Sequence, residues 1–384
     1  MTKDISVAII CLSDPNKDPR PRRLVECLKE KMAVTVIATA KYAHQSVHSY
    51  TIKKGGKGKL LNFKDLIDLK LKNYDSVMWT NELLEMKEKL KRCSFDIIIA
   101  HNIHVLPLVE EIKGNNSKVI FDAREYYPRH FDDKIFWRFF YKNYNDYLCE
   151  NYLSASDKML TVSYGISEEY KKNYSIDSEV FMSFPEYRDL ESTKPDGDFV
   201  KMIHHGNASP SRKLENMIHM MNHLDDRFSL DLMLMPTNKK YYQFLKKESV
   251  NMKNVRIIDP VPYSKIVPFL NQYDIGLYNV PISNFNMEYM LPNKFFEFVQ
   301  ARLMLAVGPS KEMKDIVLKN SIGVCADDYS PKDLASKLNE LSMDQIFQYK
   351  INSSQLAREY CAEKNCARMQ EIIFELYEER GVSV

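Results

Sequence analysis

Short apolar runs of strand length alternate with longer amphipathic segments along the chain. In the first half, runs rich in Val, Ile and Leu occupy 5–12, 33–39, 95–101, 118–123 and 158–163. Segments of helix length that mix apolar and charged residues, such as LVECLKEK and VLPLVEEIKG, separate them. Continuous β-branched runs that alternate with helices are typical of a parallel sheet covered on both faces. The pattern predicts an α/β fold for this half.

A polar segment, EYRDLESTKPDGD (186–198), interrupts this pattern with charged residues, a proline and a glycine. Such a composition favours a linker between domains. The strand pattern then restarts at 201–206 and continues with LDLMLMP, NVRIID, DIGLYNV and LMLAVG, while the tail after about 343 is helical in character. We expect two Rossmann-like domains and a last helix: 1–188, the acceptor-side domain; 189–199, the linker; 200–355, the nucleotide-sugar domain; 356–384, a helix returning toward the first domain.

Length and composition agree with this organisation and exclude some classes of protein. A chain of 384 residues suits two domains, and 45% hydrophobic residues argue against disorder. A net charge of only +2 argues against a dedicated nucleic-acid binder. The seven cysteines are scattered without CxxC pairs, which argues against a disulfide framework or zinc site and favours a reducing cytoplasm. We find neither a signal peptide nor a run near the roughly 18–20 apolar residues of a spanning helix.

Two parallel sheets in tandem bind ligands at the carboxyl ends of their strands, so we expect the site in a cleft between the sheets. The turn after the first strand carries Arg20, Arg22 and Arg23 where a helix should begin. Free N–H groups and guanidinium groups there could bind an anion, although a solvated basic turn is the alternative. No GxGxxG sequence follows this strand.

Polar side chains also follow the next strands of this half. His101 and His104 lie in AHNIHVLP, and Arg124 and Glu125 lie in KVIFDAREYYP. At strand ends these groups could position sugar hydroxyls or stabilise charge at a reacting carbon. Either histidine could equally cap a helix or pack in the core, and no third ligand nearby supports a zinc site.

The second half contains two further candidate segments. In HHGNASPSRKLENMI, the backbone near Gly206 and the charges of Arg212 and Lys213 suit a pyrophosphate, and cations would otherwise oppose the dipole of a helix that starts there. In LPNKFFEFVQA, Lys294 lies in the first turn of a helix and Glu297 follows one turn later. A carboxylate there can accept both hydroxyls of a ribose, although taken singly it would more often be a surface charge.

The segment KIFWRFFYKNYNDYL (134–148) combines aromatic and basic residues, and Lys53, Lys54, Lys57 and Lys59 lie elsewhere in the same half. It could contact the inner surface of a membrane with its rings among the headgroups. A buried helix whose cations reach out to solvent is the alternative.

In this order, the segments resemble the large retaining family of GT-B glycosyltransferases, group 1 or family 4-like, that builds bacterial capsule, lipopolysaccharide and related glycans. The resemblance spans most of the chain and rests on DPR at 18–20, AHNIHVLP, DAREYYP, LTVSYGI, HHGNASPSRKLENMI and LPNKFFEFVQA. It implies two Rossmann-like domains facing each other across a cleft. It also implies transfer with retention, by front-face attack assisted by the donor phosphate.

The resemblance and the strand-end positions together give a set of expected site residues. Expected catalytic groups are Arg212, Lys213, Arg124 and His101. Expected donor ligands are Gly206, Asn207, Arg212, Asn293, Lys294, Glu297, Glu288, Ser163 and Arg20. Expected acceptor ligands are His104, Glu125 and Arg124. We find no DxD-like pair in a suitable turn, so no cofactor and no divalent metal is expected.

Several positions depart from the family pattern. Arg124 replaces a histidine near the reaction centre, Asn207 stands where many members carry a second phosphate-binding arginine, and Tyr289 replaces the first carboxylate of an E-x7-E pair beside Glu288. Arg302 and Met304 replace a glycine and a proline. These changes leave catalytic detail open.

The sequence therefore predicts a cytoplasmic glycosyltransferase that moves a sugar from a nucleoside diphosphate sugar to a glycan or lipid-linked acceptor in bacterial surface polysaccharide synthesis. The predicted partners are these two substrates and, through 134–148, the cytoplasmic face of the membrane; nucleic acid is not among them. A catalytically degenerate subunit that binds sugar nucleotide or a partner transferase, and a sugar-nucleotide epimerase, remain alternatives.

Overall fold

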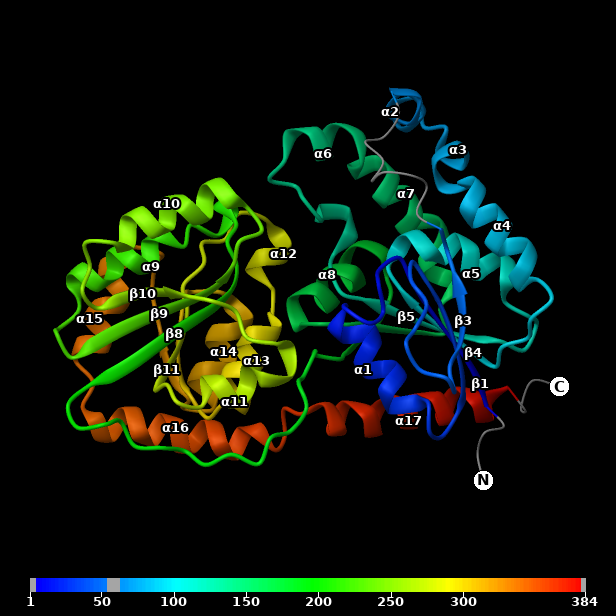
Figure 1. The fold of residues 1–384 in the computed structure, drawn as a ribbon. Coiled ribbons are helices and arrows are strands. Elements are labelled where there is room, and N and C mark those ends of the chain that lie inside the picture. The colour runs from blue at the N-terminus through cyan, green and yellow to red at the C-terminus, as the bar shows by residue number, and fades with distance from the viewer. Residues whose placement is uncertain (1–4, 54–62, 381–384) are drawn as a thin grey trace. The chain divides into compact units, whose positions relative to one another are not determined.

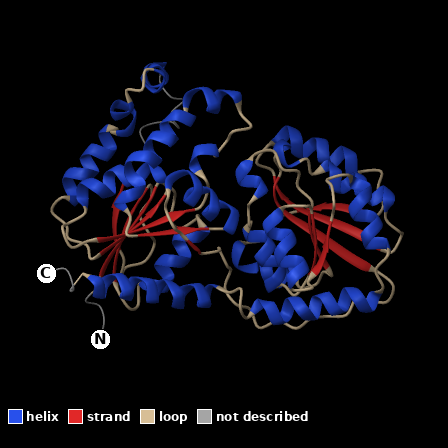
Figure 2. Ribbon diagram, turned by 180° about the vertical axis from the view of Figure 1, so that it is seen from behind, coloured by secondary structure: helices blue, strands red, loops and turns tan. Residues whose placement is uncertain are grey.

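The structure, a computed structural model, describes residues 5–53 and 63–380. Contacts divide the chain into two compact units. The first unit comprises Met1–Met182, Asn284–Asn286 and Asn365–Val384, and the second comprises Ser183–Ser283 and Met287–Lys364. Figures 1 and 2 show a sheet inside each unit with helices against both of its faces. The lysines at 54, 57 and 59 lie outside the described residues.

The sheet of the first unit is parallel, and within the described residues its strands follow the order β3-β2-β1-β4-β5-β6-β7. The strands are β1 (Ser6–Cys11), β2 (Ala33–Ala38), β3 (His48–Thr51), β4 (Ile97–His101), β5 (Lys118–Ala123), β6 (Lys158–Thr161) and β7 (Glu179–Val180). The central strands are buried on both faces, as their continuous apolar sequences require. Their register, for example Cys11 beside His101, brings their carboxyl ends to one edge.

Helices of the first unit connect these strands. They are α1 (Pro19–Leu28), α2 (Phe63–Lys70), α3 (Tyr74–Met78), α4 (Asn81–Leu90), α5 (Leu106–Ile112), α6 (Ile135–Phe140), α7 (Lys142–Tyr152) and α8 (Tyr164–Tyr174). The aromatic and basic segment 134–148 is thus not one helix, because α6 ends before Tyr141 and α7 begins after it. No helix among residues 5–53 and 63–380 is long and apolar enough to cross a membrane.

The second unit repeats the architecture with a sheet in the order β10-β9-β8-β11-β12-β13, all pairs parallel in the described chain. Its strands are β8 (Val200–Asn207), β9 (Phe228–Met235), β10 (Val255–Ile258), β11 (Ile275–Tyr278), β12 (Met304–Val307) and β13 (Gly323–Cys325). Its helices are α9 (Glu215–Met220), α10 (Lys239–Ser249), α11 (Ile266–Leu270), α13 (Asn293–Gln300), α14 (Lys311–Lys319), α15 (Pro331–Asn339) and α16 (Met343–Ala357), and the short α12 (Phe285–Glu288) spans a point where the chain passes between units.

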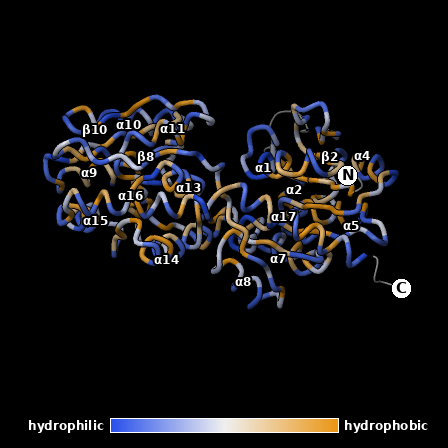
Figure 3. Tube along the Cα trace, turned by 90° about the horizontal axis from the view of Figure 1, so that it is seen from below, coloured by the Kyte–Doolittle hydropathy of each residue, from blue (hydrophilic) through white to orange (hydrophobic). Residues whose placement is uncertain are grey.

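The last helix, α17 (Ala362–Glu379), belongs to the first unit from Asn365 onward. Met369, Ile372, Ile373 and Leu376 repeat at helical spacing and are buried in the same apolar cluster as β1 and α1. In Figure 3, hydrophobic positions gather around this helix. The predicted α/β class, the two parallel sheets and the return of the last helix to the first domain are confirmed.

A disulfide between Cys27 on α1 and Cys366 on α17 corrects the expectation drawn from the cysteine pattern. The two residues are 339 positions apart, so their spacing in the sequence carries no signal of contact. They meet because α17 packs beside α1 on the same cluster. Cys11, Cys93, Cys149, Cys325 and Cys361 are free thiols in the described chain.

Candidate functional site

Two cations converge on Gly206 near the end of β8. This strand pairs with β9 on one side and β11 on the other, so its carboxyl end is the switch point of the second sheet. Gly206 has φ +142°, and a β-carbon there would lie 2.6 Å from Nζ of Lys294 and 3.3 Å from Nη1 of Arg212. Glycine is therefore required both by the backbone conformation and by the close approach of two side chains. Of the residues predicted to bind the donor, Gly206, Arg212 and Lys294 therefore lie close together.

Lys294 is buried, with 8% of its surface exposed, in the first turn of α13. Neither Lys294 nor Arg212 forms a salt bridge among the described residues, and Glu297 is the carboxylate whose charge acts on Lys294. Burial lowers the pKa of Lys294 well below its ordinary value; the charge of Arg212 lowers it further, and Glu297 partly compensates. Two close basic side chains, one of them buried without a salt bridge in the described chain, are a candidate site for an anion.

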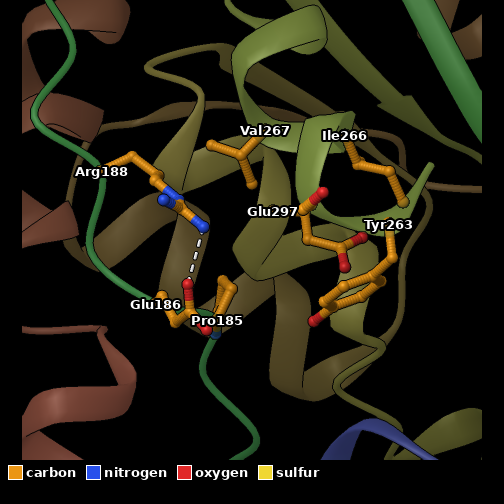
Figure 4. A pocket seen from close by; sticks show the side chains of 8 residues that line it. Pro185, Glu186, Arg188, Tyr263, Ile266, Val267 and Glu297 are labelled. Atoms are coloured by element: carbon orange, nitrogen blue, oxygen red, sulfur yellow. Dashed lines mark hydrogen bonds and ion pairs between the residues drawn. The ribbon is translucent and has the colours of Figure 1, made fainter. Parts of the chain in front are cut away.

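Glu297 lies one turn along α13 and is also buried. Its Oε2 lies 3.2 Å from Nε2 of His205 on β8, so the carboxylate is held against the sheet. Glu297 also lines a pocket within the second unit (Figure 4). The other lining residues combine aromatic, apolar and polar groups: Pro185, Glu186, Arg188, Tyr263, Ser264, Ile266 and Val267. An acidic group beside an aromatic ring and aliphatic side chains suits a nucleoside.

Three residues near this edge carry buried oxygens without a hydrogen-bond partner in the described part of the chain. They are Oδ1 of Asn279, Oδ1 of Asn293 and the hydroxyl of Tyr329. A β-carbon on Gly308, just after β12, would lie 2.8 Å from Oδ1 of Asn279 and 2.6 Å from the ring of Tyr329. Buried polar atoms without partners are costly, so a ligand that supplies the missing hydrogen bonds would be favoured.

Sequence reasoning included Asn293 but missed Asn279, Tyr329 and His205. Asn279 directly follows a strand, which was a usable signal. Tyr329 lies in a loop beyond β13, which sequence reasoning had not found, and nothing local distinguishes it. His205 is one residue before Gly206 and could have been included with it.

Other predicted residues of the second unit lie around this group. Asn207 ends β8 and is exposed, and Lys213 is exposed with φ +44°. The basic pair does not start a helix as predicted, because Arg212 ends a 3-10 turn and α9 begins later with Glu215 in its first turn. Glu288 pairs with Lys311 at 2.9 Å, and the Nζ of Lys311 also donates to the Tyr289 hydroxyl.

Arg302, at the position of a family glycine, adopts φ +63°. Its guanidinium is buried and donates hydrogen bonds to the carbonyls of Gln300 and Arg188. These bonds offset the cost of a left-handed arginine, about 1 kcal/mol or more. The fold thus accommodates an arginine at the position where the family has a glycine.

In the first unit, Arg20 and His101 meet at Asp122, a residue that sequence reasoning missed. Arg20 donates to both carboxylate oxygens, at 2.6 and 2.5 Å, and to the Phe181 carbonyl. The Nδ1 of His101 lies 2.7 Å from Asp122 Oδ2, and all three side chains are buried. Burial alone would raise the pKa of Asp122, but Arg20 and His101 hold it well below its ordinary value. The structure thus places Arg20 in a buried ion pair with Asp122, and its predicted role as a donor ligand stays a prediction.

The other predicted site residues of the first unit each contact a different set of neighbours. Arg124 donates two hydrogen bonds to Asp18, at 2.8 and 3.0 Å. His104 forms a hydrogen bond with the side chain of Asn102 and packs beside Tyr127 and Tyr144. Burial lowers the pKa of His104 to about 4. Glu125 pairs with His130. Ser163 is buried, and its hydroxyl has no partner among the residues described. His104 is half-buried among these aromatic rings, and its predicted role as an acceptor ligand stays a prediction.

Two doubly wound parallel units with the last helix joined to the first define the GT-B fold. The solved structures similar to this chain have that fold. Sucrose-phosphate synthase from Thermosynechococcus elongatus matches with a TM-score of 0.72 and 10% identity, over 98% of this chain and 100% of that one. Anabaena HepE in complex with UDP matches with a TM-score of 0.70 and 10% identity, over 97% and 100%.

An α,α-trehalose-phosphate synthase (UDP-forming) from Burkholderia vietnamiensis matches with a TM-score of 0.65 and 11% identity, over 96% of this chain and 100% of that one. At such identities the likeness shows the fold alone. No protein-family model matches the sequence, and no curated protein matches it either.

Proposed function

We propose that this protein is a glycosyltransferase that uses a uridine diphosphate sugar as donor. The observation that carries the proposal is the pair of basic side chains at Gly206, Lys294 and Arg212, which forms no salt bridge among the described residues and lies at the switch point of a parallel sheet. A diphosphate would supply the missing negative charge. Backbone N–H groups at the end of β8 would add hydrogen bonds to it.

The pocket beside Glu297 supports a nucleoside next to that diphosphate. Glu297 would accept hydrogen bonds from the ribose hydroxyls, and Tyr263 with the aliphatic side chains would contact the base. Uridine is proposed because HepE is bound to UDP in its structure and the trehalose-phosphate synthase is named as UDP-forming.

The unpartnered oxygens of Asn279, Asn293 and Tyr329 support a hydroxyl-rich group on the other side of the diphosphate. Sugar hydroxyls can donate to the two amide oxygens and exchange a hydrogen bond with the tyrosine. Lys311, held by Glu288 and Tyr289, is a further candidate for contact with the donor sugar.

In the proposed reaction the bond between the anomeric carbon and the diphosphate oxygen breaks, and a bond to an acceptor oxygen forms. The proton of the acceptor hydroxyl passes to the leaving diphosphate. Lys294, Arg212 and Lys213 would stabilise the charge that develops on this group, which is the usual dominant contribution to such catalysis. Retention at the anomeric carbon, a glycan or lipid-linked acceptor held by the first unit, and a role in bacterial surface polysaccharide synthesis follow from the family resemblance.

A donor-binding subunit without transfer activity is the second candidate function. Arg124, which replaces the family histidine, is engaged by Asp18, and Tyr289 replaces a carboxylate. Donor hydrolysis by the purified protein would exclude this candidate.

The proposal is tested by thermal shift of the purified protein with UDP, GDP, ADP and CMP, because a ligand that binds the folded state raises its melting temperature. We expect a selective shift with UDP and with one UDP-sugar. Arg212→Ala and Glu297→Ala should each weaken UDP binding by at least about tenfold, roughly 1.4 kcal/mol. Lys240→Ala removes an exposed lysine of the same unit as the control, and its affinity should be unchanged.

Wild-type affinity in both site variants would contradict the assigned site. If UDP binds and no donor is consumed with or without acceptors, the binding-subunit candidate replaces the transferase. If no nucleotide shifts the melting temperature, the proposal fails.

A further inference from the structure

Two helices of the first unit, α2 and α6, expose large apolar side chains to solvent. The exposed fractions are 79% for Phe63, 72% for Leu71, 75% for Ile135, and 55% for both Phe136 and Phe139; Ile67 is also exposed. Soluble domains seldom expose so many large apolar groups together, and such patches mark interaction surfaces. We name these six residues the apolar patch.

The patch is continuous across the two helices. The ring of Phe139 on α6 lies under the Nζ of Lys70 on α2, at 3.5 Å from the ring centroid. Figure 1 shows both helices at the same end of the first unit, and Figure 2 shows the same from behind. Residues 63–71 and 135–139 therefore form one surface, although more than sixty positions separate them in the sequence.

In both helices, apolar side chains of the kind that usually pack in a core are exposed to solvent. Phe63 and Ile67 on α2 and Leu71 just after its end are four residues apart, and the buried residues of α2 are Asp68 and Leu69. On α6 only Trp137 is buried, and Ile135, Phe136 and Phe139 are exposed. Packing within the unit thus leaves this face uncovered.

The charges around the patch are mainly positive. Six exposed cations lie in these helices or next to them: Lys64, Lys70, Lys72, Lys134, Arg138 and Lys142. Lys142 is paired with Asp146, and Asp132 and Asp133 directly precede Lys134. Residues 134–142 contain no acidic residue, and residues 63–72 contain only Asp65 and Asp68. Exposed aromatic and aliphatic groups with several cations beside them complement a surface that is apolar below and negatively charged above.

We infer that the apolar patch and its surrounding cations dock this protein on the surface of a membrane that contains anionic lipids. The rings and aliphatic chains would lie among the headgroups and upper acyl chains, while the lysines and arginine would contact lipid phosphates. The sequence alone indicated only 134–148, and the fold adds α2. The inference does not depend on the proposed transferase activity.

The test is flotation of the full-length protein with lipid vesicles. We expect binding to vesicles of about two-thirds phosphatidylcholine and one-third phosphatidylglycerol, and little binding to phosphatidylcholine alone. Phe136→Ser with Phe139→Ser should lower the vesicle partition coefficient by at least about tenfold, because two large apolar groups are lost. Lys134→Gln with Arg138→Gln should lower it by about fivefold per charge, and added salt should reproduce that effect.

Phe199→Ser with Val250→Ser serves as the matched control, because these side chains are 66% and 76% exposed in the second unit and lie outside the patch. It should bind vesicles like the wild type. The substituted side chains are all exposed, so melting temperatures should stay within a few degrees. UDP binding, measured without vesicles, should be the same in every patch variant, which separates this test from that of the proposed function.

The inference is overturned if the wild type does not bind anionic vesicles, or if the patch variants bind these vesicles as strongly as the control variant does. It is also overturned if the wild type self-associates in sedimentation experiments and Phe136→Ser with Phe139→Ser abolishes that association without changing vesicle binding. In that case the patch would be an interface between copies of the chain.

Discussion

At the scale of single residues, the two buried lysines of the second unit differ in their ion pairing. Lys350 is fully buried and paired with Asp274 at 2.9 Å, and it also donates to the Tyr273 carbonyl. Lys294 is buried without such a partner and lies beside Arg212. A buried charge that is left uncompensated costs stability, so the unpaired lysine is the one expected to serve a ligand.

Nucleotide binding should take up protons through Lys294. The pKa of Lys294 is well below 10.5 in the free protein, and a bound diphosphate would raise it toward that value. Between the lowered pKa and 10.5 the complex therefore holds more protons than the free protein. Titration calorimetry at a series of pH values below 10.5, in buffers with different ionisation enthalpies, should detect this uptake.

Lys294→Met should abolish the proton uptake and weaken UDP binding, while the stability of the free protein rises. For this lysine the unfolded chain binds more protons in the same window, so wild-type stability should increase with pH there. Lys350→Met is the control: it should destabilise the protein by about 3–5 kcal/mol, because it leaves Asp274 unpaired, and should keep the proton uptake. Equal uptake in Lys294→Met and the wild type would contradict the phosphate site.

At the scale of elements, α17 completes the core of the first unit from the far end of the sequence. Its buried stripe packs with β1 and α1, the disulfide joins Cys366 to α1, and Arg368 pairs with Glu179 of β7 at 2.7 Å. The Arg368 hydrogen bonds lower the pKa of Glu179 to about 2. Three kinds of contact therefore hold the helix.

Ile373→Ala should destabilise the first unit by about 2–5 kcal/mol, because it opens a cavity in the apolar cluster. Trp79 and Trp137 both lie in that unit and are the only tryptophans of the chain, so denaturant unfolding followed by their fluorescence measures its stability. The experiment is done in reductant so that the disulfide does not mask the loss.

Phe374→Ala, on the exposed side of the same helix, should shift the midpoint much less. If Ile373→Ala leaves the tryptophan transition unmoved, α17 is not part of the cooperative core.

At the scale of the whole molecule, the proposed donor ligands all belong to one unit. Gly206, Arg212, Asn279, Lys294 and Glu297 lie in the second unit. The first unit contains the buried cluster of Arg20, His101 and Asp122 and the apolar patch. The two parallel sheets thus carry different polar groups at their carboxyl edges.

Amide hydrogen exchange with saturating UDP should show this division. We expect the largest slowing in peptides that cover the end of β8, the 3-10 turn to Arg212 and the start of α13, because bound ligand suppresses local opening there. The exchange rates of peptides that cover β5 and α17 should change little. Slowing that is confined to the first unit would contradict the donor assignment.

Most strands were predicted from the sequence, because continuous apolar runs of four to eight residues leave few alternatives in a long α/β chain. The short β3, β7 and β13 were missed, since they lie at or near sheet edges and have weak patterns. The site residues that were predicted close to one another, Gly206 with Arg212 and Lys294 with Glu297, lie in two segments that strand order brings together. Their roles and the predicted domain ranges remain predictions.

By itself the sequence determined the fold class, because hydrophobic periodicity is a local property that each segment carries independently. Only the tertiary structure decided which charges are paired and which side chains are exposed. It placed Arg20 against Asp122, left Lys294 unpaired, joined Cys27 to Cys366, and turned the apolar residues of α2 and α6 outward. Each of these outcomes depends on partners far away in the sequence, and no local pattern encodes them.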